Sequence, residues 1–204
     1  IQRKLIKGLE DLMINYDMTV RNNMNKIVQF RYGDDGVDTI KVENQVIHLL
    51  NMSLQEIYAH FNPYNEHTKP KDINKIFIKS VVARLNSQLE DFKKVCKKYT
   101  DFMIEMRNEI VKHVFKYKKD TVVNLPVAFI NIINNIQGQT NLTSSSIVDL
   151  TLYEAFQLID ECYLNLEKIY YSPPTNLFKT LYYFYLCPKE LLIVKRFNRS
   201  ALIL

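Results

Sequence analysis

The sequence predicts a mainly α-helical protein of the α+β class, in which a helix and a small β-hairpin precede a larger helical domain. Apolar residues recur at helical spacing over most of the 204 residues, whereas strict alternation is confined to a short stretch near residue 30. Apolar residues make up 47% of the chain against only 4 Gly and 6 Pro, which excludes disordered and linker-rich proteins. The chain is long enough to bury a core without disulfide or metal staples.

The first predicted element is a helix over residues 1–16. Its apolar positions recur at the spacing of a helix with one buried stripe, namely Ile1, Leu5, Leu9, Leu12 or Met13, and Tyr16. Two short strands are predicted next, over residues 19–21 and 26–32, around a turn-like segment rich in Asn. The segment 33–38, rich in Gly and Asp, then predicts a tight acidic loop.

Helices are predicted over most of the remaining chain. A broken helical stretch begins near Val42 and ends at Asn62-Pro63, and a polar loop follows it. Two long helices are then expected, over residues 76–99 and 101–119, because apolar residues recur there at helical spacing.

Four helices are expected in the last part of the chain. They are predicted, in order, over residues 127 to 138, 152 to about 170, 176–186, and in a short segment that begins at Cys187-Pro188. Pro126 suits the first turn of a helix. Thr151 and Glu154 form the capping-box pattern, in which a hydroxyl and a carboxylate satisfy free helix N–H groups reciprocally. The segment 172–175 contains two prolines and separates two of these helices.

Charge and cysteine content limit the function classes. The chain has 27 basic and 22 acidic residues, a formal net charge of +5, and 20 Lys against 7 Arg. Nucleic-acid-binding domains are usually more basic and use Arg, so direct nucleic-acid binding is not demanded. The three widely spaced cysteines fit a reducing compartment and neither a disulfide framework nor a zinc site. The most apolar stretch, residues 177–194, is interrupted by charged residues, so we expect no membrane span.

One acidic cluster is the first candidate for chemistry. Asp34, Asp35 and Asp38 could hold Mg²⁺ or Ca²⁺ through carboxylate oxygens. Their spacing lacks the alternate ligands and final Glu of an EF-hand loop, so a structural acidic turn is the favoured interpretation. The chain shows no phosphate-binding glycine loop, zinc motif or nucleophile motif. We therefore assign no catalytic, cofactor-binding or metal-binding residue.

Two further segments have both a binding and a structural interpretation. The basic stretch 93–98 could meet phosphate or an acidic partner, but a solvated helix face is favoured. The run 182–185, which contains three tyrosines and a phenylalanine, could offer rings for base stacking. Rings in consecutive positions of a helix point in different directions, so packing in a core or an interface is favoured.

The N-terminal segment carries a family resemblance. The strings Val20-Arg21-Asn22 and Tyr32-Gly33-Asp34-Asp35-Gly36 belong to a stretch of about 38 residues that closely resembles the largest subunit of eukaryotic-type multisubunit DNA-directed RNA polymerase. Weaker resemblances lie at residues 124–127 and 194–198. Departures from the family pattern are Lys4 for Arg, Gly8 for Ala, Asn23 for Ser and Asp34 for Glu.

The resemblance implies a position in the parent subunit. A segment so placed begins at the C-terminal end of the bridge helix, passes through a hairpin beside the catalytic centre and then builds the helical foot domain. The implied domains are residues 1–44 for the bridge-helix end and hairpin, 45–192 for the foot, and 193–204 for the start of the segment that precedes the trigger loop. The family-motif residues near the active centre would be Arg3, Lys4, Arg21, Asn22, Gln29, Phe30, Tyr32, Gly33, Asp35, Gly36 and Asp38.

The resemblance also implies an activity and partners. The parent enzyme would be a nucleotidyltransferase that uses Mg and Zn, and this chain alone would be inactive, because the family's Mg²⁺-binding Asp triplet and trigger loop are absent from it. Other RNA polymerase subunits would be partners of the foot, with the mRNA-capping enzyme or transcription factors as further candidates. DNA and RNA would be contacted through the full complex. A stand-alone helical adaptor without a catalytic role is the alternative function.

Composition suggests the extent and the source of the chain. It starts without Met and ends on an apolar run, so we expect a fragment of a larger polypeptide. The abundance of Ile, Lys, Asn and Tyr indicates an AT-rich genome, and together with the short, divergent foot it suggests a large cytoplasmic DNA virus of the asfarvirus kind. A divergent AT-rich protist is the alternative. The location would be the host cytoplasm and the virion for a virus, or the nucleus for a cell.

Overall fold

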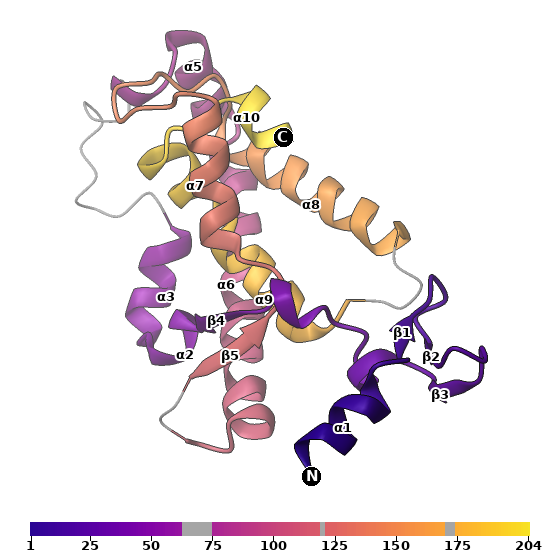
Figure 1. Cartoon of the computed structure of the whole chain (residues 1–204). Helices are drawn as coiled ribbons and strands as arrows, with labels where there is room; N and C mark the ends of the chain where they lie inside the picture. Colours follow the sequence, from indigo (N-terminus) through magenta and orange to yellow (C-terminus); the bar gives the residue numbers. More distant parts are fainter. Residues whose placement is uncertain (63–74, 119–120, 170–173) are drawn as a thin grey trace. The chain divides into compact units, whose positions relative to one another are not determined.

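The computed structural model describes residues 1–62, 75–118, 121–169 and 174–204. These residues are mainly helical with two small sheets, which confirms the predicted fold class (Figure 1). They divide into two compact units, which we call unit 1 (1–45 and 124–127) and unit 2 (the described residues of 46–123 and 128–204). The predicted domain boundaries at residues 44 and 192 stay a prediction.

Unit 1 begins with helix α1 (Gln2–Leu9) and a three-stranded antiparallel sheet of β1 (Met13–Ile14), β2 (Val20–Arg21) and β3 (Ile27–Gln29). The predicted hairpin is confirmed as β2 and β3. The prediction of one helix over residues 1–16 is wrong beyond Leu9, because Met13 and Ile14 pair with β2 instead. The spacing of apolar residues along the chain does not reveal that β1 pairs with β2.

The apolar stripe of α1 is exposed, not buried as its spacing suggested. Leu5 is 60% exposed and Leu9 63%, and α1 contains no buried residue. Val20 is the one buried residue of unit 1. An apolar stripe on a helix usually packs against another element, but no element of unit 1 covers the stripe of α1.

A two-stranded sheet joins segments far apart in the sequence, β4 (Glu43–Val46) and β5 (Val122–Leu125). The prediction of a helix from Val42 onward is therefore wrong for β4, and no strand was predicted at β5. Each strand has four residues, and its partner lies almost 80 positions away. Short 3-10 turns, η1 (Tyr32–Asp34) and η2 (Thr39–Lys41), lead into β4.

Unit 2 begins with α2 (His48–Asn51) and α3 (Leu54–Phe61), which confirm the predicted broken helical stretch. Next come α5 (Lys79–Ser87) and the long α6 (Leu89–Glu109), which a π-helical turn, η3 (Ile110–Val114), ends. The predicted break near residue 100 is wrong. Thr100 lies inside α6 and donates its hydroxyl hydrogen bond to the Cys96 carbonyl, and the break comes at Gln88. The predicted polar loop after Asn62 lies outside the described residues.

The later helices follow the sequence predictions closely. They are α7 (Phe129–Gln139), α8 (Leu152–Ile169), α9 (Asn176–Tyr185) and the π-helical turn η4 (Lys189–Val194). The capping box is confirmed, because Glu154 N–H donates to Thr151 Oγ1 and Thr151 N–H donates to a Glu154 carboxylate oxygen. A last short helix, α10 (Arg199–Ile203), was not predicted and begins at the cap Asn198.

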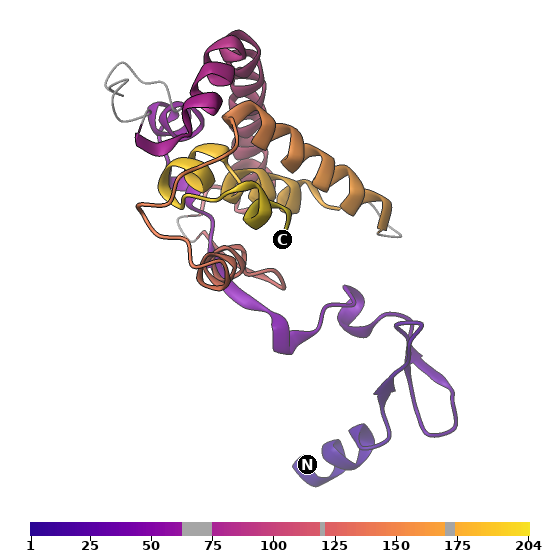
Figure 2. The ribbon, with the colours of Figure 1, turned by 90° about the horizontal axis from the view of Figure 1, so that it is seen from above.

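The core of unit 2 lies around α6, which contacts α3, α5, α8 and α9 (Figures 1 and 2). Leu49, Ile57 and Met103 are fully buried there. Tyr182 and Tyr183 of α9 are also buried, which supports the interpretation that the aromatic run packs in a core.

Candidate functional site

The family-motif residues of unit 1 gather around the hairpin. Arg21 of β2 donates from Nε to Thr19 Oγ1 at 2.9 Å, from one guanidinium nitrogen to Asp17 Oδ2 at 2.5 Å, and from the other to Asn25 Oδ1 at 3.1 Å. Hydrogen bonds from Thr19, and secondarily Arg21, hold the pKa of Asp17 below its usual value. The guanidinium thus links the segment before β2 with the turn after it.

The turn between β2 and β3 is held by Asn22. Its side-chain oxygen accepts the N–H groups of Met24 at 3.1 Å and Lys26 at 2.9 Å. Asn25 has a φ of 60°, a conformation that Asn tolerates better than most residues. The turn-like Asn-rich segment is therefore an Asn-capped turn.

Two of the three aspartates of the acidic segment, Asp35 and Asp38, hold their own loop. Asp35 Oδ1 accepts the N–H of Val37 and Asp38 Oδ1 accepts the N–H of Ile40, each at 3.0 Å. Gly33 (φ 60°) and Gly36 (φ 70°) supply the left-handed conformations that the turn needs. In the described ranges, no group of three or more His, Cys, Asp or Glu side chains could hold a metal ion. These contacts support the structural interpretation of the turn.

The structure brings some motif residues together and leaves others apart. Gln29 of β3 donates to Asp34 of the acidic turn at 3.5 Å, a weak contact. Arg3 and Lys4 are exposed on α1, and Phe30 is 82% exposed at the end of the hairpin.

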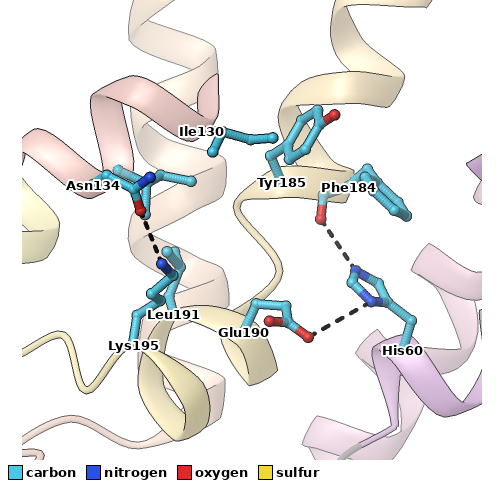
Figure 3. A pocket seen from close by; sticks show the side chains of 9 residues that line it. His60, Ile130, Asn134, Phe184, Tyr185, Glu190, Leu191 and Lys195 are labelled. Atoms are coloured by element: carbon cyan, nitrogen blue, oxygen red, sulfur yellow. Dashed lines mark hydrogen bonds and ion pairs between the residues drawn. The ribbon is translucent and has the colours of Figure 1, made fainter. Parts of the chain in front are cut away.

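Unit 2 contains a hollow that sequence reasoning missed. It has a volume of about 210 Å³ and lies between α3, α7, α9 and η4 (Figure 3). Its lining is mainly apolar, and its residues are His60, Ile130, Ile133, Asn134, Phe184, Tyr185, Glu190, Leu191 and Lys195.

His60 is the central polar residue of this hollow. Its Nε2 lies 3.2 Å from the Phe184 carbonyl oxygen and its Nδ1 4.0 Å from Glu190 Oε1 (Figure 3). The ring stacks on Phe184 with centroids 4.7 Å apart. Burial disfavours the imidazolium and lowers the pKa of His60, although the Phe184 carbonyl and Glu190 oppose this effect. No local signal in the sequence indicated these partners.

The other end of the hollow is held by Lys195. Its ammonium donates to Asn134 Oδ1 at 2.9 Å (Figure 3). Its carbonyl accepts from Gln137 Nε2 at 3.4 Å. The nearby Lys189 ammonium donates to the Ala59 carbonyl. Both lysines therefore have partners of their own.

The basic stretch on α6 is mostly a solvated face. Lys93 and Lys94 are exposed and lie 3.5 Å and 3.4 Å from Glu90 and Asp91, one helical turn earlier. Such pairs contribute little to stability. The described residues include no helix long and apolar enough to cross a membrane.

Comparison with known proteins decides the family. Residues 1–136 match the sequence family described as RNA polymerase Rpb1, domain 5. The chain belongs to this family. It is therefore part of an RNA polymerase largest subunit, as the N-terminal resemblance indicated. The chain is also similar to the DNA-directed RNA polymerase III subunit RPC1 of Giardia intestinalis, with 58% identity over 43 residues.

The segment that aligns with the Giardia subunit is a small part of both proteins. The aligned segment is 21% of this chain and 2% of the length of the Giardia subunit. The family match ends inside α7. His60, Ile130, Ile133 and Asn134 therefore lie inside the matched region, whereas Phe184, Glu190 and the other residues of α9 and η4 lie beyond it.

A second hollow of unit 2, of about 280 Å³, lies between α6, α8 and α9. The Lys179 ammonium lies 5.7 Å from the Phe102 ring centroid and 5.2 Å from that of Tyr163. The Tyr99 phenol donates to Asp160 on the wall. The rings of this hollow already hold a cation of the same chain, which fits a packing role.

Proposed function

We propose that the chain works within a DNA-directed RNA polymerase that carries out DNA-templated transcription by nucleotidyl transfer. The observation that carries this proposal is the family match over residues 1–136, which includes all of unit 1 and much of unit 2. The chain itself would be inactive, with catalysis supplied by the rest of the parent complex.

The magnesium and zinc of the parent enzyme would be held outside this chain. The carboxylates of Asp35 and Asp38 accept backbone N–H groups of their own loop, and the described residues offer no cluster of three metal ligands. The residues in hand therefore do not fit a metal site, and we derive no catalytic step through them.

Unit 1 would form the end of the bridge helix and the hairpin beside the catalytic centre. Its small buried content supports this role, because a segment that buries only Val20 by itself needs neighbours to cover its apolar side chains. Leu5 and Leu9 on α1 and Phe30 on the hairpin would contact the rest of the subunit. Arg21 would keep the hairpin in one shape while it does so.

Unit 2 would form the foot and serve as a structural and docking module for other polymerase subunits. Its helices bury their own core around α6, so it can offer an outer surface without losing its fold. The mRNA-capping enzyme and transcription factors are further candidate partners of the same surface.

The source of the parent gene decides where the enzyme works. The composition rich in Ile, Lys, Asn and Tyr supports a large cytoplasmic DNA virus, whose polymerase would act in the host cytoplasm and be packaged in the virion. A cellular gene would place the enzyme in the nucleus. Immunofluorescence with an antibody against this chain separates the two.

Affinity purification of the parent protein tests the proposed function. The antigen should reside in a polypeptide far larger than the 24.2 kDa of this chain and should co-purify with a second large polymerase subunit. Removal of residues 46–192 from the parent should release some smaller subunits, if unit 2 docks them. A free 24 kDa protein without polymerase subunits would instead support the adaptor alternative.

A further inference from the structure

Two hydrogen-bond acceptors, His60 Nδ1 and Glu190 Oε1, face each other in the hollow beside His60. A carbonyl oxygen only accepts, so His60 Nε2 must carry the proton that it shares with the Phe184 carbonyl at 3.2 Å. In the neutral ring Nδ1 then carries a lone pair, and it faces Glu190 Oε1 at 4.0 Å (Figure 3). That separation is too long for a direct hydrogen bond, so both atoms have acceptor capacity for a third group.

The position of these acceptors suits a ligand that enters from solvent. The side chain of His60 is 13% exposed, whereas that of Glu190 is 41% exposed. A donor that approaches along Glu190 would therefore meet the carboxylate first and the more buried Nδ1 second. Hydrogen bonds between a cationic donor and a carboxylate are among the strongest in proteins.

The rest of the lining suits an aliphatic stem. Ile130, Ile133 and Leu191 supply apolar walls, and Ile130 is itself 48% exposed. Long basic side chains bury their methylene groups along such surfaces and keep the charged head at a polar site. The Lys195 ammonium, the other charge in the lining, already donates to Asn134.

We propose that this hollow binds a basic side chain of a partner protein, with its cationic head between His60 Nδ1 and Glu190 and its methylene stem against Ile130, Ile133 and Leu191. Arginine fits best, because its planar fork can donate to two acceptors at once and because it is enriched at protein interfaces. The inference rests on the proposed docking role of unit 2 and specifies the chemistry of one contact.

Titration of the full 204-residue chain with butylguanidinium chloride tests this site. The probe carries the head and stem of an arginine side chain, and long-range ¹⁵N NMR of the histidine rings reports on Nδ1 of His60. A saturable shift of the His60 Nδ1 resonance is expected, without a comparable shift of exposed His113. Butanol, which has the stem without the cation, should leave Nδ1 unchanged.

Two variants sharpen the test. Glu190→Gln should weaken butylguanidinium binding by about tenfold, because it removes the charge from one acceptor. Glu161→Gln, an exposed change on α8, is the matched control and should bind like the original chain. Ile130→Phe should also block the probe, because it fills the hollow from a half-exposed position and leaves the polar pair in place.

The proposal is overturned if butylguanidinium gives no saturable shift at His60, if butanol gives the same shift, or if Glu190→Gln binds equally well. A water molecule between the two acceptors would then account for their spacing. This titration contains no polymerase subunit, so its failure leaves the co-purification test of the proposed function unaffected.

Discussion

The phenol of Tyr99 on α6 donates a hydrogen bond to the carboxylate of Asp160 on α8. The Tyr99 ring also stacks on Phe156, with centroids 4.9 Å apart and planes 10° from parallel. Burial, followed by the bond to Asp160, raises the pKa of Tyr99 far above its usual value. This pair joins two helices of unit 2 through a part-buried polar contact.

Tyr99→Phe should lower the free energy of unfolding by about 1 to 3 kcal/mol, because it removes a phenol that donates to a part-buried carboxylate. Urea unfolding followed by circular dichroism measures this change. Tyr58→Phe is the matched control, because Tyr58 is 50% exposed on α3, and it should shift the free energy by less than about 0.5 kcal/mol. Equal effects of the two changes would contradict the role of the Tyr99–Asp160 pair.

Thr151→Val should destabilise unit 2 by about 0.5 to 2 kcal/mol, because valine keeps the shape of threonine and removes the helix cap. The hydroxyl of Thr151 also donates to Gln88 Oε1 at 2.8 Å, so the change breaks a contact with the junction of α5 and α6 as well. Thr151→Ser keeps the hydroxyl and should lose less stability. Thermal unfolding of the two variants provides the comparison, and a more stable Val variant would refute the capping argument.

The free energy of unfolding should depend on the protonation of His60 in mild acid. Because burial lowers the pKa of His60, the unfolded chain binds this proton more readily than the folded chain does. The neutral His60 contributes its full share to the free energy of unfolding above the pKa of an unfolded histidine, about 6.5. This share is lost as the pH falls from there through the lower pKa of the folded state.

His60→Gln should reduce the loss of stability in mild acid, since glutamine can donate to the Phe184 carbonyl and does not titrate. Urea unfolding between about pH 7 and pH 5 measures the slope, in the range where an ordinary histidine titrates. His113→Gln, at an exposed position, should keep the slope of the original chain. Identical slopes in all three proteins would show that His60 does not contribute.

The three cysteines should differ sharply in reactivity. Burial raises the pKa of Cys96 and of Cys187 to about 12 each, whereas Cys162 is exposed. The thiolate is the reactive form, so a disulfide reagent at neutral pH should modify Cys162 fast and the other two only after unfolding. Mass spectrometry after a brief reaction identifies the modified residue. Rapid modification of Cys96 in the folded chain would contradict its burial.

Sequence reasoning succeeded where local signals decide the structure. Helix α8 begins at a capping box formed by Thr151 and Glu154, three positions apart, and its apolar spacing continues to Ile169. It failed where a distant partner decides. Glu43–Val46 forms a strand because β5 lies beside it, and the exposed stripe of α1 looked buried because periodicity does not reveal what covers a helix.

The candidate sites show the same division. The acidic turn was predictable, since Gly33, Gly36 and the aspartates act within a few residues of each other. The His60 hollow was not, because Glu190 and Phe184 lie more than 120 positions from His60 and belong to other helices. A histidine without a recognised ligand motif gives no local sign of such partners.

We propose that this chain works as part of a DNA-directed RNA polymerase. Template-dependent incorporation of labelled nucleotides measures it directly, when an antibody against this chain is used to isolate the native complex. The isolated complex should make RNA on a DNA template with Mg²⁺, and the 204-residue chain alone should make none. A complex that contains the chain and lacks this activity, or activity of the chain by itself, would contradict the account.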